Sequence, residues 1–190
     1  MRINIIQLII FMSFVFAFSE FLLMLVKHSR IKTAKTRKDQ GSMILIWVMI
    51  TFGFTAGFFL AKHDSWKSIN SIITAFGLLL ILLGIIIRWI AIVQLGKSFT
   101  VDVAITDTAR LKTDGLFRRV RHPSYLGLLI IIIGFSVTMN SLISFFIFVI
   151  SVTVAVLNRI RVEEKVLFQE FGDNYTEYKS KTKKLIPGIY

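Results

Sequence analysis

Apolar residues form long, almost uninterrupted runs along this chain, and polar residues collect between them. A membrane-spanning helix needs about 20 residues, because the bilayer core is about 30 Å thick and each helical residue rises about 1.5 Å. Three runs have this length, and a fourth, residues 124–157, is too long for one span. Its centre holds Asn140-Ser141, which predicts a tight turn between two helices. The predicted spans are residues 3–26, 43–61, 69–95, 124–139 and 141–158.

The predicted fold class is therefore all-α: a multi-pass membrane helix bundle of five spans with a cytoplasmic C-terminal helical segment. We take residues 1–190 as a single membrane domain. The first run is not interpreted as a signal peptide, because its apolar part is longer than the roughly 7–15 residues of such a segment and continues past Ala17-Phe18-Ser19.

Composition supports a membrane protein. Of 190 residues, 55% are hydrophobic and only 18% are charged, against about 25% in soluble domains. A soluble fold of this size could not bury so much apolar surface, and a disordered chain would be far more polar. The absence of cysteine excludes a disulfide scaffold, thiol catalysis and thiolate metal sites. Three scattered histidines do not predict a zinc site, so no metal is expected.

The basic residues are distributed unevenly between the two ends of the predicted spans. Residues 27–41, 96–123 and 159–190 hold 19 of the 23 lysines and arginines. The positive-inside rule then places the N-terminus outside and the C-terminus in the cytoplasm, and the compact build suggests a prokaryotic plasma membrane. Topology and attraction to anionic lipid explain the net charge of +12, so no nucleic-acid partner is expected.

Two charges interrupt the apolar runs. Glu20 in the first span and Arg88 in the third both lie six or seven residues before a cytoplasmic end, at about the same depth. An intramembrane charge is costly, so we expect an ion pair that joins the two spans. The alternative is that each side chain reaches separately to the interface. In the second span, the GxxxG pattern from Gly53 to Gly57 predicts close helix packing.

The cytoplasmic segments 96–127 and 159–190 are the places where polar chemistry can occur. Arg121, His122 and Tyr125 cluster where the chain enters the fourth span, and a helix N-terminus there can hold an anion. An ordinary juxtamembrane turn is the alternative. Further along, Arg159 and Glu163 share one helix face, which predicts either a ligand-facing pair or a solvated salt bridge.

The C-terminal segment predicts a helix that continues from the last span and ends at Phe171-Gly172. Asp173 or Asn174 can cap a short second helix, which Pro187 would end.

Several of these motifs occur together in one known family. The order Arg-His-Pro-Ser-Tyr-Leu-Gly at residues 121–127, Glu163-Glu164 with Leu167, Phe171-Gly172 with Tyr175 and Tyr178, and Ile186-Pro187 closely resembles the isoprenylcysteine carboxyl methyltransferase family. Phospholipid N-methyltransferases are its wider relatives. The resemblance covers about residues 95–190, and the short length resembles the five-span prokaryotic members.

The resemblance implies a membrane methyltransferase whose cofactor, S-adenosyl-L-methionine, lies at the cytoplasmic face between the loop before the fourth span and the C-terminal helices. The catalytic residues would be Arg159, which would meet the acceptor, and Arg121. The chain departs from the family at two positions, since Ala109 replaces a frequent histidine and Phe117 a frequent tyrosine. The implied cofactor-binding residues are Ala109, Arg110, Leu111, Lys112, Phe117, His122, Pro123, Ser124, Tyr125 and Glu163.

The implied reaction is O-methylation of a prenylcysteine-like carboxylate on a lipophilic or lipidated acceptor that enters from the membrane lipids. A carboxylate is ionised at neutral pH, so no general base is required. The Arg159 guanidinium could bind both oxygens of this carboxylate in a bidentate interaction. The alternatives are N-methylation of a phospholipid amine, reduction with NADPH, and a non-catalytic membrane scaffold. The oligomeric state stays open.

Overall fold

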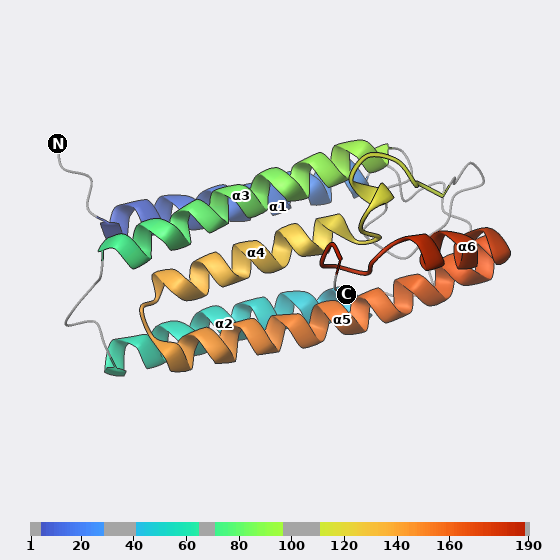
Figure 1. Cartoon of the computed structure of the whole chain (residues 1–190). Helices are drawn as coiled ribbons and strands as arrows, with labels where there is room; N and C mark the ends of the chain where they lie inside the picture. The colour runs from blue at the N-terminus through green and yellow to red at the C-terminus, as the bar shows by residue number, and fades with distance from the viewer. Residues whose placement is uncertain (1–4, 29–40, 65–70, 97–110, 189–190) are drawn as a thin grey trace.

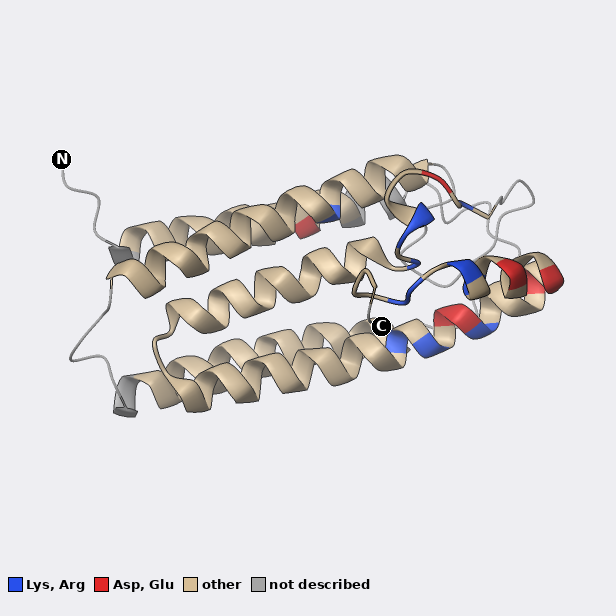
Figure 2. Ribbon diagram, in the orientation of Figure 1, with Lys and Arg blue, Asp and Glu red and all other residues tan. Residues whose placement is uncertain are grey.

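The protein is a bundle of long helices (Figure 1), and its charged residues lie mainly at one end, which we call the polar cap (Figure 2). The computed structural model describes residues 5–28, 41–64, 71–96 and 111–188. The elements in chain order are α1 (Ile5–His28), α2 (Gly41–Asp64), α3 (Ser71–Leu95), the 3-10 turn η3 (Gly115–Arg118), α4 (Pro123–Thr138), α5 (Leu142–Phe171) and α6 (Asp173–Lys181).

Helix α4 lies at the centre of the bundle. It packs against α3 on one side and α5 on the other, while α1 lies along α3 and α2 lies along α5 (Figure 1). The short helix α6 folds back onto the far end of α5. This arrangement surrounds α4 with apolar helices and leaves its first turn close to the polar cap.

Three helices of the described part are long and apolar enough to cross a membrane: Gly41–Ala61, Ser71–Leu95 and Leu142–Phe171. Two shorter apolar helices, Gln7–Leu23 and Pro123–Thr138, complete the bundle. The expected all-α membrane bundle is thus confirmed. The number of five spans stays a prediction.

The turn predicted between the last two spans is confirmed. Helix α4 ends at Thr138, and Asn140 adopts a left-handed φ of 51°. Its side-chain amide donates to Thr74 Oγ1 of α3 at 3.1 Å, which holds the turn against the neighbouring helix. Ser141 then caps α5, because its hydroxyl accepts from Ser144 N at 3.3 Å.

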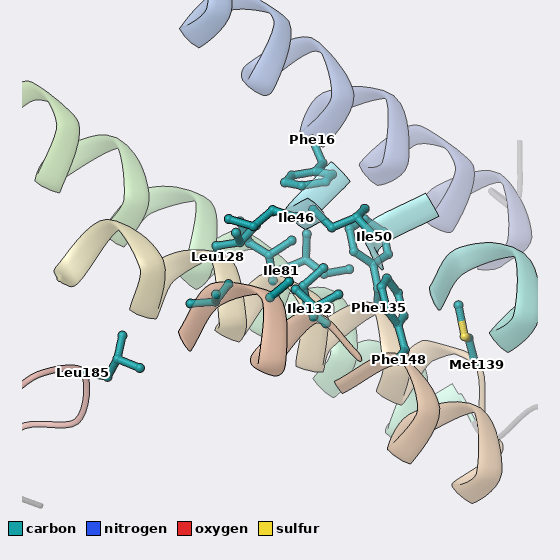
Figure 3. Close-up of a cluster of buried hydrophobic side chains, with 14 of the residues drawn as sticks. Phe16, Ile46, Ile50, Ile81, Leu128, Ile132, Phe135, Met139, Phe148 and Leu185 are labelled. Carbon is teal, nitrogen blue, oxygen red and sulfur yellow. The ribbon is translucent and has the colours of Figure 1, made fainter. Parts of the chain in front are cut away.

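An aromatic cluster joins four helices in the core. The Phe54 ring of α2 lies 5.0 Å from that of Phe135 in α4 and 4.8 Å from that of Phe148 in α5. Phe16 of α1 completes the group at 5.8 Å from Phe135. Figure 3 shows Phe16, Phe135 and Phe148 among the side chains of the apolar cluster. Tilted and edge-on ring pairs at these separations add to the energy of apolar burial.

Glycines allow α3 and α4 to pack with their backbones close together. A Cβ at Gly77 would lie 2.7 Å from the carbonyl oxygen of Gly134, and one at Gly84 would lie 2.7 Å from that of Gly127. The predicted close packing at Gly53 is also confirmed, because the Phe148 ring occupies the space that a Cβ would need.

The C-terminal segment corrects two local predictions. Gly172, with a φ of 52°, ends α5 as expected, but α6 begins at Asp173 without a side-chain cap. Helix α6 ends at Lys181, so the predicted end at Pro187 is wrong. The reason is a long-range pairing: Lys183 N donates to Arg119 O at 3.1 Å.

Two further backbone bonds complete this pairing. Arg121 N donates to Lys183 O at 2.8 Å, and His122 N donates to Lys184 O at 3.1 Å. Val120 and Lys183 form an isolated parallel β-bridge, which places residues 182–185 beside residues 119–122. We call residues 182–185 the C-terminal strand. It brings the end of the described chain to the start of α4.

Candidate active site

The first turn of α4 lies where the apolar bundle meets the charged cap, and charged residues concentrate at that end in Figure 2. Pro123 is the first residue of α4, a position that requires no backbone donor. His122 precedes it and is buried, and its carbonyl accepts from Leu126 N at 3.1 Å. The predicted entry into this helix is therefore confirmed.

Arg121 links this turn to two other segments. Its Nε donates to Glu164 Oε1 of α5 at 3.0 Å. One terminal amino group donates to the carbonyls of Thr182 at 2.5 Å and Lys179 at 3.2 Å. Because the guanidinium is buried and these partners belong to the protein, Arg121 holds the turn, α5 and the C-terminal strand together. Its predicted catalytic role stays a prediction.

His122 lies between two neighbouring carboxylates. Its Nε2 is 3.3 Å from Glu164 Oε1, and its Nδ1 is 3.9 Å from Glu163 Oε2. Glu164 therefore joins both Arg121 and His122, although only Glu163 was a predicted site residue. The acidic pair Glu163-Glu164 was the signal that could have identified it.

Arg159 is buried one helical turn before Glu163, with 2% of its surface exposed. Its Nε donates to the Tyr125 hydroxyl at 3.3 Å, and a terminal amino group donates to Ser42 Oγ of α2 at 2.9 Å. The rings of Tyr125 and His122 are 5.8 Å apart. The structure thus brings Arg159, Tyr125, His122 and Glu163 into one group. Ser42 was not predicted.

Two buried oxygen atoms at this site have no hydrogen-bond partner within the described residues: Glu163 Oε2 and Tyr175 Oη. Buried polar atoms normally have partners, so both mark positions where a bound molecule would supply one. Burial, together with the negative charge of Glu164, raises the pKa of the Tyr175 phenol. The Tyr175 phenol is therefore neutral at neutral pH and can donate a hydrogen bond.

Phe117 lies in η3 and contacts α6. Its ring is buried, and its carbonyl accepts a hydrogen bond of 2.7 Å from the Tyr178 hydroxyl. Burial raises the pKa of Tyr178 to about 12, so this hydroxyl remains a donor at neutral pH. The contact fixes η3 against α6.

The other predicted binding residues differ in their placement. Lys112 pairs with Asp114 at 2.8 Å on the surface. Among the described residues, neither Leu111 nor Lys112 forms a hydrogen bond or ion pair with the group around His122. Ala109 and Arg110 lie outside the described residues.

Ser124 connects the site to the membrane-embedded charges. Arg88 donates from one amino group to both Ser124 O and Ser124 Oγ, each at 3.1 Å. Its other two donors bind Glu20, from Nε to Oε1 at 2.6 Å and from Nη2 to Oε2 at 2.9 Å. The expected ion pair between Glu20 and Arg88 is confirmed, and it also reaches α4.

The described part of the chain contains no group of three or more His, Asp or Glu side chains placed to hold a metal ion.

Comparisons with known proteins extend this description. Residues 77–169 match the isoprenylcysteine carboxyl methyltransferase family. Protein-S-isoprenylcysteine O-methyltransferase B of Arabidopsis thaliana is 37% identical over 119 residues, which cover 62% of this chain and 60% of that protein. The Saccharomyces cerevisiae protein-S-isoprenylcysteine O-methyltransferase is 37% identical over 131 residues, which cover 67% and 54%.

A solved structure has a similar fold. It is that of a eukaryotic intramembrane Ras methyltransferase, an isoprenylcysteine carboxyl methyltransferase, with a TM-score of 0.65 and 25% sequence identity. The match covers 73% of this chain and 52% of that one. The chain thus spans 60% or less of the length of each of these three relatives.

Proposed function

We propose that this chain, whose residues 77–169 match the isoprenylcysteine carboxyl methyltransferase family, is a member of that family and transfers a methyl group from S-adenosyl-L-methionine to a prenylcysteine-like carboxylate. The observation that carries the proposal is the group of Arg159, Tyr125, His122 and Glu163, in which Glu163 Oε2 is buried and lacks a hydrogen-bond partner among the described residues. A guanidinium for the acceptor and a carboxylate for the donor lie one helical turn apart on α5.

The donor fits the unpartnered atoms of the site. Its ammonium and ribose hydroxyls are the donors that Glu163 Oε2 lacks, and its carboxylate can accept from the Tyr175 hydroxyl. Tyr125 and Phe117 provide aromatic surface for an adenine, and His122 provides a ring N–H. When bound, S-adenosyl-L-methionine supplies an electrophilic methyl group on a sulfonium.

Arg159 is the residue proposed to meet the acceptor. A planar guanidinium matches a carboxylate in two places, and the hydroxyls of Ser42 and Tyr125 fix its orientation. The acceptor carboxylate is already ionised at neutral pH, so the residues need only align it and exclude water. The surrounding apolar helices would serve the second requirement, because they bury Arg159 away from water.

Arg121 and Glu164 contribute by holding His122. Glu164 Oε1 is shared between the Arg121 guanidinium and the His122 ring, so loss of either charge would release the ring from its place. Arg121 would therefore act in the reaction by positioning His122 through Glu164.

We further propose the topology that the charge pattern predicts: five spans in a single domain, the N-terminus outside, and the C-terminus in the cytoplasm of a prokaryote. Helix α1 has 24 residues, enough for a span of about 36 Å, while the 16 residues of α4 reach about 24 Å. Helix α4 is covered by α3 and α5, which lets a shorter helix cross the bilayer core. The charged cap in Figure 2 would then face the cytoplasm.

Binding and turnover test the proposal together. Calorimetry on the detergent-purified chain should detect S-adenosylhomocysteine, and Glu163→Ala and His122→Ala should abolish its binding. Methyl transfer to an N-acylated farnesylcysteine should then exceed transfer to phosphatidylethanolamine. Ser151→Ala, on the same helix but bonded only to Phe148 O, is the matched control and should behave as wild type.

Failure of well-folded wild type to bind S-adenosylhomocysteine, in detergent and in lipid nanodiscs, would overturn the methyltransferase assignment. Binding followed by transfer only to the phospholipid amine would overturn the acceptor.

A further inference from the structure

The Arg88 side chain connects three helices of the bundle. It belongs to α3, binds both carboxylate oxygens of Glu20 in α1, and donates to the carbonyl and the hydroxyl of Ser124 in α4. Glu20 is 4% exposed and Arg88 is 7% exposed. A doubly bonded, buried ion pair has little freedom, so whatever it contacts is held in a defined place.

Ser124 lies between His122 and Tyr125 in the sequence. His122 precedes it by two positions and Tyr125 follows it directly. The helices are also in backbone contact at this level, because a Cβ at Gly127 would lie 2.7 Å from Arg88 N. Arg88 therefore contacts the first turn of α4 from α3.

We propose that Glu20 and Arg88 are positioning residues for the methyl-donor site: the pair fixes the first turn of α4 through Ser124 and thereby sets His122 and Tyr125. The inference rests on the proposed function. It assigns the intramembrane pair a role in donor binding in addition to joining α1 to α3.

A merely structural pair and a positioning pair respond differently to one double replacement. Removal of one partner leaves a buried charge without compensation and destabilises strongly, whichever role the pair has. Replacement of both partners by apolar residues of similar volume is often neutral or stabilising. Glu20→Leu combined with Arg88→Met should therefore retain the fold while it loses both the ion pair and the hydrogen bonds to Ser124.

The experiment measures thermal stability and the Kd for S-adenosylhomocysteine on the purified full chain. We expect the double variant to unfold near the wild-type temperature and to bind about tenfold more weakly, since small displacements of binding groups cost this much or more. In turnover, KM for the methyl donor should rise while kcat and KM for the acceptor change little. Asn140→Ala, which removes the α3–α4 contact at the opposite end, should lower stability and leave the Kd unchanged.

A double variant that folds and binds with the wild-type Kd overturns the positioning role. If the double variant does not fold, Arg88→Lys decides, because a compact ammonium lacks the planar guanidinium whose separate nitrogens bind Glu20 and Ser124 at the same time. That variant should raise KM for the donor, and a wild-type KM would overturn the inference. Absence of binding by wild type would instead reject the proposed function itself.

Discussion

The Nε of Arg159 donates to the hydroxyl of Tyr125 at 3.3 Å, which joins α5 to the first turn of α4 inside the buried site. Tyr125 belongs to the proposed donor side and Arg159 to the acceptor side. The two substrates would therefore meet at a contact between two protein side chains, and changes at either residue should be separable by substrate.

Arg159→Lys should affect the acceptor alone. Lysine keeps the charge but not the planar fork, so kcat/KM for the prenylated acceptor should fall about 100-fold, the usual scale for one oriented charged contact. The Kd for S-adenosylhomocysteine should stay within about twofold of wild type. Equal losses in donor binding and acceptor turnover would contradict this division of the site.

Ser42 should be required for the placement of Arg159. Ser42→Ala removes a hydroxyl that accepts from Arg159 at 2.9 Å, a bond worth about 1 kcal/mol, so KM for the acceptor should rise about fivefold. Ser42→Thr keeps the hydroxyl and is the matched control. If Thr and Ala variants behave alike in steady-state kinetics, the hydroxyl has no such role.

Arg121 and Glu164 should depend on each other. Arg121→Gln or Glu164→Gln leaves one buried charge without its partner and should lower the free energy of unfolding by about 3 kcal/mol. The double variant should lose less than the two single losses added together. Chemical denaturation measures these values, and limited proteolysis should cut the C-terminal strand sooner in each single variant. Strict additivity would contradict a coupled pair.

Close packing of α3 and α4 should tolerate no added methyl group. Gly134→Ala would place Cβ 2.7 Å from Gly77 O, and the resulting separation of the helices should cost about 1–3 kcal/mol. Ala75→Leu adds larger bulk to an exposed position of α3 and should be nearly neutral. Thermal unfolding of the two variants in the same detergent provides the comparison, and equal melting temperatures would argue against tight packing.

Tyr178 should make stability sensitive to alkaline pH. Burial raises its pKa to about 12, whereas an exposed phenol titrates near 10, so folding favours the neutral form. Its contribution is complete below about pH 10 and is lost as the pH rises toward 12. Tyr178→Phe loses the bond to Phe117 O at neutral pH but should show a smaller decline between pH 10 and 12. Parallel declines in both proteins would contradict this assignment.

Local sequence patterns were sufficient to predict those features of the fold that depend on neighbouring residues or on depth in the membrane. The turn at Asn140-Ser141 was predictable because two polar residues that favour turns interrupt an apolar run there. The pairing of Glu20 with Arg88 was predictable because an isolated charge inside a bilayer is costly and both residues lie at one depth. Prolonged apolar runs likewise predicted most helix positions.

Signals failed where distant segments decide. The end of α6 depends on the hydrogen bonds of Lys183 with Arg119 and Arg121, which lie more than sixty positions earlier. A local signal such as Pro187 does not report such a long-range pairing. Ser42 is an ordinary serine in the sequence and becomes a site residue only because α2 lies beside α5. The close packing of α3 at Gly77 and Gly84 was also not predicted, because these glycines are seven residues apart and do not form a GxxxG pattern.

The pairing of the C-terminal strand with residues 119–122 has a consequence for biosynthesis. Translation produces α4 and its preceding turn long before residues 183 and 184, whose carbonyls bind the backbone of Arg121 and His122. A nascent chain can therefore have every apolar helix inserted while this turn still lacks its strand partner. Maturation of the site follows membrane insertion and awaits the emergence of residue 185 from the ribosome.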